Sequence, residues 1–223
     1  MLLSYLKAGV SVTAVCMLCA SASAYSMFNT YTVSFVSDGE PSKIMTVETF
    51  DTQGGTRDLQ AVEVELFHSG HFEAKVWNDD PIKSAEVKAR LIRQWLLSGP
   101  DIDPAATETY KLYTSPQVHL DPGQEHDFGQ VGYSKTAAGT YNPVDVTLYE
   151  TSGPGTVDFT VTPLLMVNDL AFIGGAPDVW RMQVKNPDLT VEAKVTYIYI
   201  PEPATLAMLL VAAPFLRYRA TKR

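Results

Sequence analysis

The chain of 223 residues contains 17 Lys and Arg against 25 Asp and Glu, a formal net charge of −8. Residues 25–200 hold 12 of those cations and 24 of those acids, so this body of the chain carries −12. An acidic body repels phosphate backbones, which argues against a nucleic-acid partner. Both cysteines, Cys16 and Cys19, precede residue 25, which excludes disulfide or thiol chemistry from the body.

Residues 1–24 predict a secretory signal peptide. Lys7 is the only early side-chain charge, an apolar stretch follows over 8–20, and Ala22 and Ala24 supply the small residues that signal peptidase needs. We therefore expect cleavage after Ala24 and export of the chain. Val and Leu, rather than a small residue, precede the two cysteines, so we expect export without lipidation.

Alternation of apolar and polar residues predicts strands in the first half of the body. It occurs over 30–36, 43–48, 62–66 and 72–76. The segment 68–71, with the sequence His-Ser-Gly-His, predicts a hairpin connection between the last two of these strands.

The second half continues the same pattern. Alternation over 82–97 favours a strand, although its Lys, Glu, Ala and Leu content leaves a helix open. The segment 98–118 is rich in Pro, Thr and Asp and predicts a long loop. Further strands are predicted at 144–149, 156–162 and 190–200, the last of which is the clearest.

Glycine and proline clusters separate these strands and predict turns. They lie at 38–39, 54–55, 99–100, 121–123, 153–155 and 174–175. Short strands with turns at this spacing predict an all-β fold, with residues 25–200 forming a single β-sandwich of jelly-roll or other Greek-key type.

The C-terminal segment 201–223 consists of three parts in order: a proline-containing motif, an apolar run and a basic cluster. Pro201-Glu202-Pro203 is rigid and extended, and an apolar run follows over 204–216. A basic cluster comes next: Arg217, Arg219, Lys222 and Arg223. Thirteen helical residues span roughly 20 Å, against a hydrocarbon core of about 30 Å. Pro214 interrupts this short helix, so we expect a transient sorting signal and not a weak anchor or a tail packed on the body. The basic cluster is expected to stay on the cytoplasmic side of the membrane.

This tail resembles the PEP-CTERM sorting signal of Gram-negative and related bacteria, through residues 201–203, the apolar run and the basic cluster. Exosortase, a membrane protease-transpeptidase, recognises that signal. The resemblance implies signal peptidase and exosortase as partners. It also implies transient anchoring in the inner membrane, then a cell-surface or extracellular location, plausibly with exopolysaccharide or biofilm.

The body resembles the choice-of-anchor E domain of bacterial surface proteins. Phe50-Asp51 with Gly54-Gly55 and the strand over 59–67 is similar to its early segment, while Arg57 and Asp58 depart from it. Two later segments, 121–129 and 169–174, are similar to its central and late segments. The resemblance implies an exported surface protein and carries no catalytic residue.

Metal-binding candidates are few. A metal site formed by His68 and His71 would need a third ligand brought close by the fold. We expect them instead to be two polar residues that flank a turn. Acidic residues in the loops suggest calcium binding, because carboxylates are calcium ligands. None has the spacing of a twelve-residue calcium loop, so we expect them to be solvated turn residues. The acidic candidates are Asp79, Asp80, Asp101, Asp103, Asp121, Glu125 and Asp127. We therefore expect no metal and no cofactor.

Catalytic motifs are absent from the sequence. There is no Gly-x-Ser-x-Gly elbow and no phosphate-binding glycine loop, so we expect no enzyme. Aromatic residues could form a sugar-stacking platform, although core positions are the more ordinary role of such rings. These residues are Trp77, Trp95, Trp180, Tyr110, Tyr113, Tyr133, Tyr141 and Tyr149. A noncatalytic surface or matrix protein is the leading hypothesis. The alternative is a lectin-like carbohydrate-binding module, with calcium dependence left open.

Overall fold

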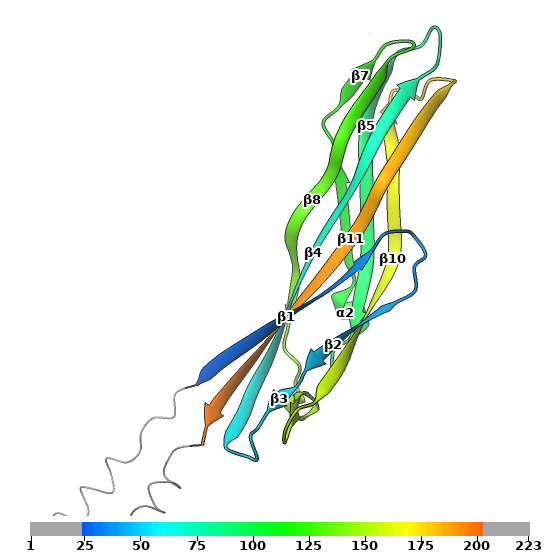
Figure 1. Ribbon diagram of the computed structural model, residues 1–223. Helices are drawn as coiled ribbons and strands as arrows, with labels where there is room; N and C mark the ends of the chain where they lie inside the picture. Colours follow the sequence, from blue (N-terminus) through cyan, green and yellow to red (C-terminus); the bar gives the residue numbers. More distant parts are fainter. Residues whose placement is uncertain (1–23, 203–223) are drawn as a thin grey trace, which may run out of the picture.

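Two antiparallel sheets form most of the computed structural model, which describes residues 24–202 (Figure 1). The first sheet contains, in spatial order, β1 (Tyr25–Phe35), β11 (Trp180–Pro201), β4 (Arg57–Asn78) and β8 (Glu125–Tyr141). The second contains β2 (Lys43–Glu48), β10 (Thr156–Ile173), β5 (Ala85–Ser98) and β6 (Thr109–Thr114), with β7 (Val118–Leu120) also paired to β5.

Four short elements complete the fold. β3 (Phe50–Asp51) and β9 (Glu150–Thr151) form a parallel pair. The helix α2 (Pro104–Thr107) and the 3-10 helix η1 (Val146–Tyr149) lie in the connections after β5 and β8. The body is elongated, because β4, β10 and β11 run along most of its length (Figure 1).

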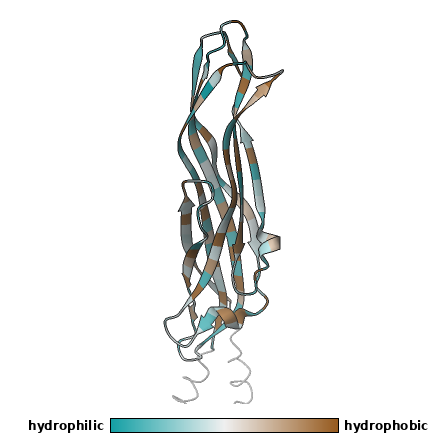
Figure 2. Cartoon of the chain, turned by 90° about the vertical axis from the view of Figure 1, so that its right-hand side faces the viewer, coloured by the Kyte–Doolittle hydropathy of each residue, from teal (hydrophilic) through white to brown (hydrophobic). Residues whose placement is uncertain are grey.

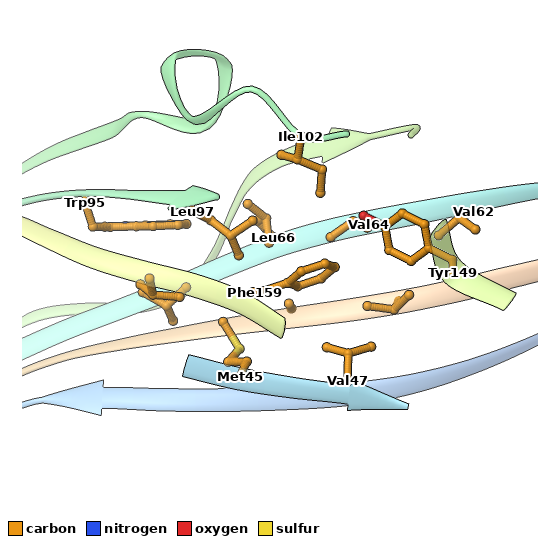
Figure 3. Close-up of a cluster of buried hydrophobic side chains, with 14 of the residues drawn as sticks. Met45, Val47, Val62, Val64, Leu66, Trp95, Leu97, Ile102, Tyr149 and Phe159 are labelled. Carbon is orange, nitrogen blue, oxygen red and sulfur yellow. The ribbon is translucent and has the colours of Figure 1, made fainter. Parts of the chain in front are cut away.

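The hydrophobic core lies between the two sheets, as expected of a β-sandwich. Polar and apolar residues alternate along the long strands, so that each strand turns one row of side chains inward (Figure 2). Figure 3 shows Met45 and Val47 of β2 and Val64 of β4 directed toward the same space as Phe159 of β10. Trp95 of β5 is fully buried in the same cluster. Burial of these side chains is the main stabilising contribution to a chain whose body has no cysteine.

The predicted hairpin at 68–71 is wrong, because β4 is one continuous strand. Phe72 lies six positions after Leu66, and every second residue between them is buried, so the inward-facing row continues without a break. Gly70 has no positive φ and pairs with Leu189 of β11. This glycine serves close packing instead of a turn: a Cβ there would lie 3.0 Å from Cγ of Arg93.

Two further predictions are corrected. The segment 144–149 is not a strand, because Asp145 caps η1 by accepting from the Thr147 N–H. Val146 and Tyr149, three residues apart, face the core, whereas Val144 is 90% exposed. The segment 98–118 is also not one loop, since it contains α2 and β6.

Most other strand predictions are confirmed, although the observed strands are longer. The strand at 43–48 has the predicted bounds, and 82–97 is largely the strand β5. The predictions at 156–162 and 190–200 are parts of the longer β10 and β11. β8 was missed, because three glycines and three register shifts against β4 obscure its alternation.

Candidate functional site

The last strand of the body runs directly into the predicted sorting motif. Pro201 ends β11 opposite Arg57 of β4, and the Glu202 N–H donates to the Thr56 carbonyl over 2.8 Å. Proline is tolerated at a strand end, where its missing N–H needs no partner. The motif therefore begins as extended backbone held at the end of a sheet. The remaining predicted sorting residues lie outside the described residues: Pro203, Arg217, Arg219, Lys222 and Arg223.

The predicted N-terminal processing site lies at the same end of the body. Ala24 is exposed, β1 begins at the next residue, and Ala22 lies outside the described residues. Tyr25 pairs with Tyr199 of β11, and their ring centroids are 6.1 Å apart. Because β1 is antiparallel to β11, the chain enters and leaves the body side by side (Figure 1).

A hollow of about 640 Å³ opens beside this end, between the two sheets. Its lining includes Met27 and Asn29 of β1, Glu48 of β2, Arg57 of β4 and Tyr197 of β11. A carboxylate, a guanidinium and an amide around an apolar wall can accept a polar ligand of small-molecule size. No pattern in the sequence indicates this hollow, because its residues come from strands that are far apart along the chain.

A second hollow, of about 450 Å³, is lined by the first residues of the predicted sorting motif. Arg57 lines it as well, together with Asp58, Glu150, Pro201 and Glu202. A cation and three carboxylates thus surround the point where β11 ends. The motif leaves the fold from a polar, accessible surface.

His68 and His71 do not form a metal pair. Residues three apart on a strand face opposite sides of the sheet, and only His68 is buried, with 3% of its surface exposed. Its Nδ1 accepts hydrogen bonds from Trp95 Nε1 at 3.2 Å and from the Tyr133 hydroxyl at 2.9 Å. Burial lowers the pKa of His68 to about 4, so it is neutral at physiological pH. The backbone N–H of His71 donates to the Asp188 carboxylate.

The other two histidines are also apart from this pair. His119 contacts Glu86 at 2.7 Å and Asp121 at 3.2 Å, and its pKa is raised chiefly by the Glu86 carboxylate. The ring of His126 packs edge-on against Phe128. Between residues 24 and 202 no three His, Cys, Asp or Glu side chains gather as a metal site requires.

The acidic pair Asp79 and Asp80 holds the loop after β4. Asp80 accepts from the backbone N–H groups of Ile82, Lys83 and Asp178, each at 2.9 Å, and these bonds lower the pKa of its carboxyl. Asp79 forms a two-bond ion pair with the Arg181 guanidinium, which lowers the pKa of Asp79.

The remaining calcium candidates hold turns or strand ends as well. Asp101 accepts from the N–H groups of Val144 and Asp145, Asp103 caps α2, and Asp127 accepts from the Gly129 N–H at 2.8 Å. The Glu125 carboxylate accepts from Lys75 and from Trp77, which lowers its pKa. These contacts fit the interpretation of the acidic residues as turn and strand-end residues.

The predicted aromatic residues do not gather into a platform on the described surface. Trp95, Tyr133 and Tyr149 are buried. Trp77 lies between two cations, with Lys75 and Arg181 each about 5 Å from its ring. Tyr113 and Tyr141 pack against the core. Tyr110 and Trp180 are exposed, but they belong to different sheets.

A buried polar layer crosses the sandwich, and sequence reasoning missed it. Arg93 is fully buried, and its guanidinium donates to the carbonyls of Asp188, His71 and Val167 and to the Asn168 side chain at 2.7 to 3.2 Å. The guanidinium also donates to the carbonyl of Ile92, the preceding residue, at 2.9 Å. Burial lowers the pKa of Arg93 to about 10, so it stays charged at neutral pH. The layer formed by Arg93 and the His68–Tyr133 pair lies between two apolar clusters, and we assign it a structural role.

No helix within residues 24–202 combines the length and the hydropathy needed to cross a bilayer.

Comparison with known proteins adds little. No protein family matches the chain, and no curated protein does. A solved structure of the infectious bursal disease virus VP2 subviral particle matches with 11% identity and a TM-score of 0.22, covering 80% of this chain and 37% of that one. The Gt strain of the same virus gives 9% identity and a TM-score of 0.19, covering 82% and 38%. The chain thus spans under two fifths of these proteins, and such TM-scores support no conclusion.

Proposed function

We propose that this is an exported, noncatalytic surface or matrix protein that is cut at both ends. Residues 1–24 are the signal peptide, 25–200 the displayed body and 201–223 the signal read by an exosortase. The main support for this proposal is the C-terminal segment. It contains the motif at 201–203, the apolar run and the basic cluster in the order found in such a sorting signal. After sorting, the body is held at the cell surface or in the matrix, in association with exopolysaccharide.

The geometry of the body supports this assignment. Tyr25 follows Ala24 directly and pairs with Tyr199, two residues before Pro201. Both proposed cleavage points therefore lie at one end of an elongated body, with almost no linker between the fold and either point. A membrane enzyme can reach both while the opposite end of the body points away.

The strand order further supports a jelly-roll assignment for 25–200. Order β1-β11-β4-β8 faces order β2-β10-β5-β6, and successive long strands alternate between the sheets except from β5 to β6. Such alternation produces the two interleaved Greek keys of a jelly roll. A scaffold of this kind displays loops at its ends and needs no active site.

Mass spectrometry of the protein recovered from its own cells tests the sorting proposal. We expect a chain that starts at Tyr25, ends near Pro201 to Pro203, and carries any group attached by the transpeptidase. Glu202→Gln should reduce this processing, whereas Asp58→Asn, in the same hollow but outside the motif, should not. An unmodified wild-type chain that still ends at Arg223, with unchanged fractionation after deletion of 201–223, would contradict the proposal.

For the alternative function, carbohydrate binding, the candidate site that we propose is the 640 Å³ hollow. Titration of the mature protein against a glycan panel, with calcium and with chelator, tests it. Binding that Glu48→Gln weakens, while Glu73→Gln on the far part of β4 does not, would support a lectin-like module. No binding across the panel would leave the structural role standing.

A further inference from the structure

The edge strand β1 differs from the other sheet edges in the described body. Its eleven residues, Tyr25–Phe35, contain no charged residue, no proline and no glycine. It pairs only with β11, over an unbroken register from Tyr25 to Phe35. Every second residue of an antiparallel edge strand directs its N–H and C=O away from its partner, so β1 presents a row of open backbone groups.

The other edges carry the protections that sheets ordinarily use. β8 contains Glu125, Asp127 and Lys135, and three register shifts break its pairing with β4. β2 has only six residues, with Lys43 and Glu48 at its ends. β6 and β7 are short and are separated by a segment that contains a proline. Charges, bulges and short lengths discourage edge-to-edge pairing, and β1 has none of them.

Apolar side chains gather at the open part of β1. Tyr25 is 55% exposed, Met27 39% and Phe28 62%. At the other end of the strand, the Lys43 ammonium donates to the Ser34 carbonyl at 2.5 Å and covers the edge there. The available edge therefore extends from Tyr25 to Val33, and its sequence has the high β-propensity and zero charge of segments that pair with themselves.

We propose that β1 is a self-association strand, which pairs antiparallel with β1 of a second copy to join two four-stranded sheets into one of eight strands. An antiparallel pair of identical strands is isologous, so a two-fold axis passes near Asn29 and the contact closes as a dimer. A second copy is the occupant that the strand itself favours, because a strand of high β-propensity without charged residues is complementary to an identical strand. The −12 body repels another copy over most of its surface, so two copies approach most readily along β1, which contains no charged residue.

Single-cysteine crosslinking in cells tests the pairing in the full chain. The body has no cysteine, and a background with Cys16 and Cys19 replaced by Ser removes the two near the N-terminus. Cysteines are placed one at a time at Ser26, Phe28, Asn29, Thr30 and Thr32, with Ser134→Cys on the β8 edge as the control. We expect oxidation to give a dimer that peaks at one or two neighbouring positions of β1 and is absent at Ser134. No dimer at any β1 position, or an equal dimer at Ser134, would overturn the proposal.

Charge insertion gives a second, independent measurement. Thr30→Lys with Thr32→Lys places like charges on both strands of the pair, which should weaken dimerisation by about tenfold or more. Sedimentation of the processed protein measures the change, and an unchanged melting temperature shows that the fold is intact. A dimer of unchanged strength would refute the assignment to β1. If Phe28→Ser abolishes binding to phospholipid vesicles while no crosslinked dimer forms, the exposed strand binds a lipid surface and the proposal fails.

Discussion

His68 and Arg93 show how a polar side chain becomes part of a β-sandwich core. Arg93 lies in the inward row of β5 with Leu91 and Trp95, so the alternation alone marks it as buried. Its acceptors could not be predicted, because the carbonyls of Val167 and Asp188 are placed by the registers of β10 and β11. A single sequence can therefore predict that a side chain faces the core, but not which groups will be its hydrogen-bond partners.

Replacing Arg93 is expected to be costly. Arg93→Met leaves several buried carbonyl oxygens without a donor, and should lower the free energy of unfolding by about 3 kcal/mol. Arg93→Lys should restore only part of this, because one ammonium cannot reproduce the planar fork of donors. Arg90→Met on the opposite face of β5 breaks only a half-exposed ion pair with Asp169, and should cost less than about 1 kcal/mol. Urea unfolding measures all three, and similar values for Arg93→Met and Arg90→Met would contradict the structural role.

His68 should make stability depend on pH. Burial, and secondarily the charge of Lys111, lowers its pKa from 6.5 to about 4 in the folded protein. The unfolded chain therefore binds a proton at higher pH than the folded chain does, and stability falls as the pH drops from about 6.5 toward 4. Between pH 7 and pH 5 the wild type should lose about 2 kcal/mol more than His68→Gln.

A matched control for this pH effect is His119→Gln. The pKa of exposed His119 is raised by Glu86, so its contribution has the opposite sign and its removal leaves the acid-induced loss in place. Urea unfolding at both pH values makes the comparison. If His68→Gln and wild type lose the same free energy, the His68 ring is not the source.

At the scale of elements, the glycine and proline clusters predicted turns that all lie between strands in the structure, and the one wrong turn prediction is the segment 68–71. Leu66 and Phe72 fall on the same side of one continuous alternation that runs through Gly70, which favours a single strand. The His-Ser-Gly-His segment between them favours a hairpin. The strand is observed because both neighbours, β11 and β8, pair across that segment. Long-range pairing thus overrides a local turn signal. The same limit applies to the candidate hollow, whose walls come from six strands.

Proline substitution distinguishes the continuous strand from a hairpin. Ser69 pairs with Thr190 in the interior of the sheet, so Ser69→Pro removes a backbone donor and should destabilise the protein by about 3 kcal/mol or more. Ser84→Pro, in the loop between β4 and β5, should cost less than about 1 kcal/mol. Thermal or urea unfolding compares them. Equal, small costs would mean that residues 68–71 form a turn after all.

For the whole molecule, the fold class could be predicted, but the proximity of the two ends could not. That proximity follows from the pairing of β1 with β11, which no local pattern encodes. Ser26 lies opposite Ile198, and the body has no cysteine of its own. Ser26→Cys with Ile198→Cys should form a disulfide in an oxidising compartment and stabilise the protein by about 2 to 4 kcal/mol.

The control for this crosslink is Ser26→Cys alone, which should leave stability unchanged. Adding a reductant should return the double variant to the stability of the single one. Failure of the two cysteines to bond within one chain under oxidising conditions would show that the ends are not adjacent. Nonreducing electrophoresis and unfolding with and without reductant provide the measurements.

The strand β11 has a mechanical consequence. It runs from Trp180 at the end distant from the termini to Pro201, and it is bonded to β1 on one side and to β4 on the other. A pull between a tether after Pro201 and a load on the distant loops acts along the axis of this strand. Its two ladders are then loaded in shear, so many hydrogen bonds must break together instead of one after another. A body tethered in this way would resist drag from flowing liquid better than one suspended from a strand that could be peeled away.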